Sequence, residues 1–183
     1  MTQAAGRAGF PNAIVVAHGD SAWDGWFLWH AVRGDTAILA AVYEPGMAAT
    51  GLARVPGAGG VGFRSVRFSP FLSYAGLIDV DVLQHPFMLE TDMEFHTHHI
   101  VRMAGNRIEQ VCQFDGDSRS STSKGVGTTT SVRRVEVIEL LGPTPRFRVS
   151  ATTSQNADAT VRPGAATIHV DYEMPTDGRC VVR

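Results

Sequence analysis

Three imidazoles and a carboxylate crowd into one short segment, Glu94-Phe95-His96-Thr97-His98-His99. Side chains alternate across an extended strand, so Glu94, His96 and His98 project from one face. A His-x-His pair at this spacing supplies two corners of a zinc or iron site. A metal-dependent enzyme is therefore one interpretation, with the remaining ligand taken from His169, Asp171 or Glu109.

The opposite row of the same segment is mostly apolar and contains His99 beside Thr97. A partly desolvated imidazole has a pKa that one neighbouring group moves across neutrality, which suits general acid or base catalysis. His30 has the same setting in a second apolar row. We predict that His99 and His30 are catalytic, together with Tyr172, unless each histidine is a core residue bonded to a backbone carbonyl.

The polar rows of these strands are expected to face solvent instead of a cavity. His96 and His98 share a row with Asp92, and Asp79 and Asp81 alternate with apolar residues of an earlier strand. Polar rows opposite apolar rows are typical of solvent-exposed faces. On this interpretation these side chains face solvent, and the chemistry needs no metal or other cofactor. Ligand-binding residues are expected on the inward rows, at Trp26, Trp29, Tyr43, Phe95, Thr97, Gln110 and Cys112.

An apolar period of two runs along most of the chain and predicts the β-strands that position these residues. Two hairpins are indicated, 26–32 with 36–43 and 100–103 with 108–114, each joined by a short turn that contains glycine. The further strand candidates are 13–17, 62–68, 74–84, 87–98, 132–140, 146–153 and 165–174.

About ten strands in one short chain predict a single all-β domain over residues 1–183. We expect an antiparallel β-barrel of about 8–10 strands with a central cavity, or alternatively a β-sandwich. The Ser-, Thr- and Gly-rich stretch 115–131 is expected to be a mobile loop that covers a barrel mouth. The strand 26–32 is apolar on both faces, so a loop, a helix or a second subunit is expected to cover it, and a homodimer is one such arrangement.

Asp24-Gly25-Trp26 opens the first long hairpin, and a succession of antiparallel strands follows. In these features the chain resembles a lipocalin-type (calycin) β-barrel. The resemblance implies a central pocket for an apolar small molecule. Similar barrels act as carriers and, in bacterial secondary metabolism, as cyclases or isomerases.

The charge balance, the apolar segments and the cysteines limit the classes of partner and the cellular location that we expect. The 183 residues carry 16 basic and 18 acidic side chains, so no strong field favours nucleic acid or an anionic membrane. No segment approaches the roughly 20 apolar residues that span a bilayer, and we expect a cytoplasmic protein. Cys112 and Cys180 match no CxxC pattern and are expected to be free thiols.

Together these patterns favour an enzyme that binds a hydrophobic, polyketide-like metabolite. It would promote cyclisation, isomerisation or elimination by general acid/base catalysis, without a cofactor. Two alternatives stay open. One is a carrier that binds a hydrophobic ligand without chemistry, and the other is the Zn- or Fe-dependent enzyme that uses His96 and His98.

Overall fold

The computed structural model describes the backbone of residues 14–17, 26–33, 36–43, 49–56, 63–74, 76–88, 91–104, 107–124, 127–157, 160–162, 167–174 and 179–183. Side chains are described at 67, 69–74, 76–86, 91–102, 109–123, 128–155, 167–174 and 179–183. All regular structure in these ranges is β-strand, which confirms the predicted all-β class. Within them, no helix has the length and apolarity needed to cross a membrane.

The strands follow from alternating apolar and polar residues rich in Val, Ile and Thr, which suit a pleated surface with one buried side. Their bounds are β1 (Ile14–Ala17), β2 (Trp26–Arg33), β3 (Thr36–Tyr43), β4 (Ala49–Pro56), β5 (Phe63–Pro70), β6 (Leu77–Gln84), β7 (Phe87–Met88), β8 (Thr91–Ala104), β9 (Arg107–Lys124), β10 (Gly127–Leu140), β11 (Arg146–Ala157), β12 (Thr160–Arg162), β13 (Ile168–Glu173) and β14 (Val181–Val182).

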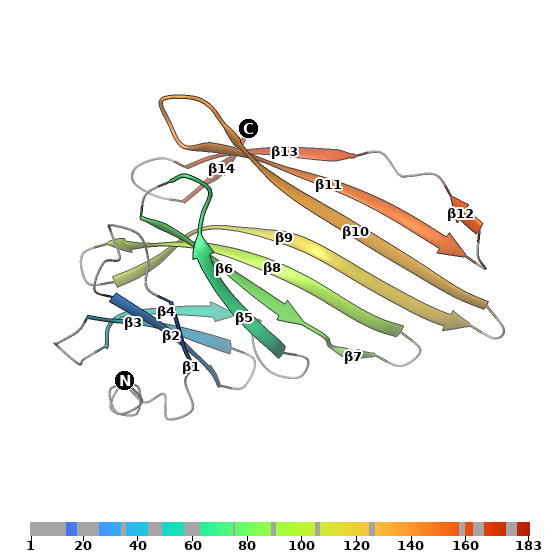
Figure 1. Ribbon diagram of the computed structural model, residues 1–183, viewed down its shortest axis with the longest axis horizontal. Helices are drawn as coiled ribbons and strands as arrows, with labels where there is room; N and C mark the ends of the chain where they lie inside the picture. The colour runs from blue at the N-terminus through green and yellow to red at the C-terminus, as the bar shows by residue number, and fades with distance from the viewer. Residues whose placement is uncertain are drawn as a thin grey trace.

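The strands form two antiparallel sheets (Figure 1). The smaller sheet has the order β1-β2-β3-β4, and its β3 and β4 run close to β9. The larger sheet has the order β14-β13-β11-β10-β9-β8-β6-β5, with β12 beside β11 and β7 beside β8. Because β14 and β5 end this order without pairing to each other, the described strands do not close into the predicted barrel.

The stretch 115–131 is a long hairpin rather than the predicted loop. β9 continues to Lys124, β10 begins at Gly127, and residues 118–124 pair with residues 127–133. Hydroxyl groups meet across the strands, as in the 3.3 Å contact between Ser121 Oγ and Thr130 Oγ1. Cross-strand hydroxyl pairs and β-branched threonines favour strand pairing, so a polar composition was the wrong reason to expect a loop here.

Beyond the hairpin, β9 and β10 diverge into two branches of the sheet (Figure 1). Where their pairing ends, the backbone N–H of Val135 donates instead to the Asp117 carboxylate at 2.7 Å. Along both the hairpin and the diverging parts, β9 also pairs with β8 and β10 also pairs with β11. A buried apolar cluster joins the two branches, and its members are Phe71, Ile100, Val111, Cys112, Phe114, Phe147, Val149 and Met174.

A disulfide between Cys112 and Cys180 links the same two branches. Beside it, the backbone N–H of Cys180 donates to the carbonyl of Val111 at 2.7 Å. The prediction of free thiols is therefore wrong, because residues 68 positions apart in sequence become neighbours only through the fold. Disulfides persist mainly in oxidising compartments. The disulfide is thus an argument against the predicted cytoplasmic location. The location itself stays a prediction.

Candidate functional site

The neighbouring strands β6 and β8 bring two carboxylates to two imidazoles. The register sets Asp81 opposite His98 and Asp79 opposite Ile100, so each histidine meets a carboxylate diagonally. His96 Nδ1 lies 2.7 Å from Asp81 Oδ1, and His98 Nδ1 lies 2.9 Å from Asp79 Oδ2. A carboxylate only accepts hydrogen bonds, so each imidazole donates from Nδ1.

The part of this row around His96 and His98 is half-buried, which corrects the prediction that it faces solvent, whereas Asp92 in the same row is 72% exposed. The side chains of His98 and Asp79 are 19% and 15% exposed, and those of His96 and Asp81 are 28% and 18% exposed. Side chains of β10 cover the row, because Val135 and Val137 line the same pocket. The alternation of polar and apolar residues correctly showed which side chains share a face. It could not show that β10, a strand later in the chain, covers that face.

Two adjoining pockets open over this row, and we call them together the histidine groove. The smaller pocket has a volume of about 260 Å³ and is lined by Asp81, His96, His98, Asp117, Val135 and Val137. The larger pocket, of about 400 Å³, shares His96 and Asp117 and adds Glu94, Ser118, Arg119, Thr130, Val132 and Arg134. His96 therefore belongs to the wall of both pockets.

The His98 ring is held from several sides. It stacks on Phe114 with ring centroids 5.0 Å apart, and a Cβ added at Gly116 would lie only 2.6 Å from its Nε2. Glycine is needed at 116 because any side chain there would displace the ring. Burial alone would lower the pKa of His98, but the hydrogen bond and charge of Asp79, with the charges of Asp81 and Asp117, raise that pKa above 6.5.

His96 keeps one ring nitrogen available. Its Nδ1 bonds to Asp81, and its Nε2 has no partner among the residues whose side chains are described. A carboxylate that holds the proton on Nδ1 leaves the lone pair on Nε2, which is the tautomer that a general base requires. Asp117 stands nearby as an anion: burial alone would raise its pKa, but hydrogen bonds from the Val135 N–H and from Arg134 lower it.

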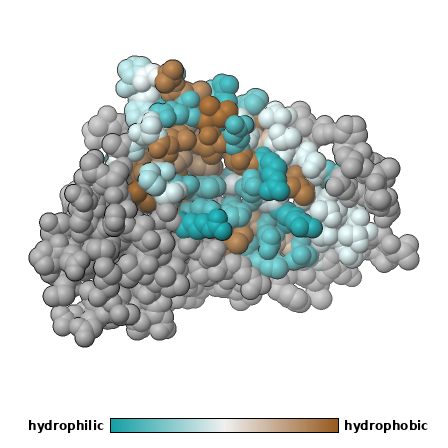
Figure 2. Space-filling view, in the orientation of Figure 1, coloured by the Kyte–Doolittle hydropathy of each residue, from teal (hydrophilic) through white to brown (hydrophobic). Residues whose placement is uncertain are grey.

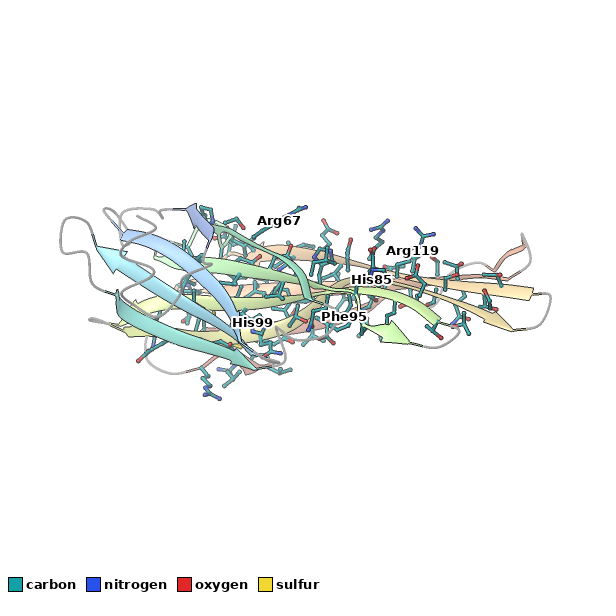
Figure 3. The ribbon with its side chains drawn as sticks, turned by 90° about the horizontal axis from the view of Figure 1, so that it is seen from below. Arg67, His85, Phe95, His99 and Arg119 are labelled. Carbon is teal, nitrogen blue, oxygen red and sulfur yellow. A yellow bond between two sulfur atoms is a disulfide. The ribbon has the colours of Figure 1, made fainter. Side chains whose placement is uncertain are left out.

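His99 lies on the opposite face of β8. Figure 3 shows His99 and Phe95 on one side of the sheet and Arg119 on the other. The side chain of His99 is 1% exposed, and its Nδ1 lies 3.1 Å from Gln110 Oε1. Burial lowers the pKa of His99 to about 4. The structure thus brings together the predicted residues His99 and Gln110, with Thr97 in the same row, but in a buried contact outside the described pockets.

Of the other predicted site residues, Tyr172 and Cys112 have described side chains, and neither lines the histidine groove. Tyr172, on β13, stacks on Phe147 with ring centroids 4.9 Å apart. Cys112 is in the disulfide and offers no thiol. The side chains of four predicted residues on β2 and β3 lie outside the described residues; these are His30, Trp26, Trp29 and Tyr43.

The four predicted metal ligands are not gathered. His169 Nδ1 contacts Ser150 Oγ at 2.8 Å across β11 and β13, whereas Glu94, His96 and His98 lie on β8. In the described part of the chain, no group of three metal-ligating side chains is arranged to hold an ion. The metal-dependent alternative therefore has no assembled site among these residues.

Sequence reasoning left the two aspartates out of the candidate site, although a signal was present. Asp79 and Asp81 have the same i, i+2 spacing as His96 and His98 on a neighbouring strand. Matching polar rows on paired strands are placed to form side-chain pairs across the sheet. Asp117 and Gly116 gave no such signal, because their roles depend on the bulge in β9 opposite His96.

No protein-family model, curated protein or solved structure matches the chain. Its function is therefore inferred from the geometry of the groove.

Proposed function

We propose that the protein is an enzyme that needs no cofactor and moves a proton on a small molecule bound in the histidine groove. The reaction class is cyclisation, isomerisation or elimination. The observation that carries the proposal is the 2.7 Å contact between His96 Nδ1 and Asp81 Oδ1, because His96 lines both pockets and Asp81 lines the smaller one. An oriented base beside a space for substrate is the minimum that proton transfer requires.

In this reaction His96 Nε2 accepts a proton from a carbon of the substrate. Asp81 stays ionised and stabilises the imidazolium, as the carboxylate of a catalytic triad does. In an isomerisation the proton returns to another carbon of the substrate. In a cyclisation the carbanion forms a bond to a carbonyl carbon of the same molecule, the C=O π bond breaks, and the resulting alkoxide takes the proton from His96. In an elimination the electron pair forms a double bond as the leaving group departs, and the leaving group takes the proton. The raised pKa of His98 favours its imidazolium form, and in that form His98 stabilises negative charge that develops on the substrate nearby.

The proposal keeps the reaction class expected from the sequence and assigns the base to His96 instead of His99. A base must reach the proton that it removes. His99 is almost fully buried and its low pKa makes it a weak base, whereas His96 borders open space.

Deuterium exchange tests the proposal without knowledge of the natural substrate. Wild-type protein is incubated in D₂O with a panel of enolisable linear and cyclic ketones, and loss of the α-proton signal is followed by ¹H NMR. We expect catalysed exchange for at least one ketone, slowed about 100-fold or more in His96→Gln, since general acid–base catalysis contributes on this order. Asp81→Asn should also slow exchange, because it removes the group that fixes the tautomer.

The matched control is His169→Gln, which removes an exposed imidazole from β13, away from the groove. It should exchange at the wild-type rate. The proposal is wrong if His96→Gln exchanges as fast as wild type, or if no ketone in the panel exchanges faster than it does in buffer.

A further inference from the structure

A second pocket, which we call the apolar trough, lies along the apolar face of β11 and β13 and shares no lining residue with the histidine groove. Its volume is about 430 Å³, and cross-strand neighbours form its floor, with Val149 opposite Val170 and Ala151 opposite Ile168. Phe114 and Tyr172 also line it. In Figure 2, apolar side chains gather over the region of β11 and β13, and hydrophilic ones lie over β8 and β9.

Polar groups also line this trough, namely Gln113, Asp115, Arg133, Thr153 and the Tyr172 hydroxyl. Arg133 and Asp115 line it, and their closest approach of 3.6 Å is longer than a hydrogen bond. The guanidinium therefore keeps its N–H donors available to a ligand. Burial, and then the charge of Asp115, raise the pKa of Tyr172 while Arg133 lowers it, which places the phenol close to both charges and keeps it protonated.

We infer that the apolar trough is a second small-molecule site, which binds a flat apolar compound bearing one carboxylate. The volume falls within the range of about 300–1,000 Å³ that is usual for ligand pockets, and an apolar floor with few polar groups is their usual composition. Arg133 offers the planar pair of donors that a carboxylate binds, and Tyr172 offers a hydroxyl. Asp115 is 75% exposed, so it can turn into solvent when the carboxylate takes its place beside Arg133.

Two probes with the same two-ring body test the inference, namely 2-naphthoate and the neutral 2-naphthalenemethanol. Their affinities are measured by isothermal titration calorimetry. Wild type should bind the carboxylate about tenfold more tightly or better, as expected for a hydrogen bond to a charged group. Arg133→Gln should remove this preference, and Tyr172→Phe should weaken naphthoate binding.

Arg148→Gln is the matched control, because Arg148 lies on β11 but pairs with Asp171 on the opposite face of the sheet. It should bind both probes like wild type. Backbone amide shifts of the wild-type protein locate the probe without any variant, and the shifts should concentrate in residues 149–153 and 168–172.

Four results would overturn the inference. They are equal affinity of wild type for the two probes, an unchanged preference in folded Arg133→Gln, amide shifts centred on β6 and β8, and absence of binding at millimolar probe. This experiment is independent of the exchange assay, so either proposal can fail without the other.

Discussion

Reduction of the Cys112–Cys180 disulfide is expected to remove about 4 kcal/mol from the free energy of unfolding. The bond joins residues 68 positions apart. A cross-link that closes a loop of about 70 residues lowers the entropy of the unfolded chain by an amount worth about 4 kcal/mol at room temperature.

Urea unfolding followed by circular dichroism measures this loss in oxidised and reduced wild-type protein. With a slope of about 2 kcal/mol per molar urea, the midpoint should fall by about 2 M on reduction. The double variant Cys112→Ala, Cys180→Ala should resemble the reduced protein, with a small further loss because Cys112 is buried in the cluster. Equal midpoints for the oxidised and reduced protein would refute this reasoning, as would free thiols titrated in the folded, unreduced protein.

Three further predictions concern the strands around the groove. As pH falls from about 7 to 4, the free energy of unfolding should decrease by about 3 kcal/mol because of His99. The pKa of this histidine is about 6.5 in the unfolded chain and about 4 in the folded protein, so protonation favours the unfolded chain. His99→Gln should reduce that loss in urea unfolding at the two pH values, and an unchanged loss would contradict the assignment. Asp79→Asn should bring the pKa of His98 below 6.5 in an NMR titration, because burial lowers this pKa and the Asp79 charge that raises it is removed. A pKa still above 6.5 would count against the pairing of His98 with Asp79. Gly116→Ala should destabilise the protein by about 1–3 kcal/mol through its clash with the His98 ring, and a wild-type urea midpoint would be inconsistent with that contact.

Local features of the fold could be predicted from the sequence because alternation is a local property of a strand. Thr97 and His99 were expected on an inward row, and both side chains are buried. The turn between residues 104 and 107 also separates two strands as expected. These predictions needed only the side chains of the strand itself.

Long-range features could not be read in the same way. The partner of Cys112 lies 68 residues away, and the pattern of cysteines did not indicate it. The polar row of His96 was predicted to face solvent. The side chains that cover it, Val135 and Val137, belong to a different branch of the sheet and could not be inferred from alternation. The choice between His99 and His96 as the base depends on that cover, so it required the structure.

The tautomer of His96 tests the central claim most directly. Long-range ¹H–¹⁵N correlation spectra at about pH 7 distinguish the two ring nitrogens, which coordinates alone do not. We predict a proton on Nδ1, a lone pair on Nε2, and loss of this single tautomer in Asp81→Asn. A proton held on Nε2 in wild type, or a tautomer that Asp81→Asn leaves unchanged, would contradict the assignment of His96 as the base.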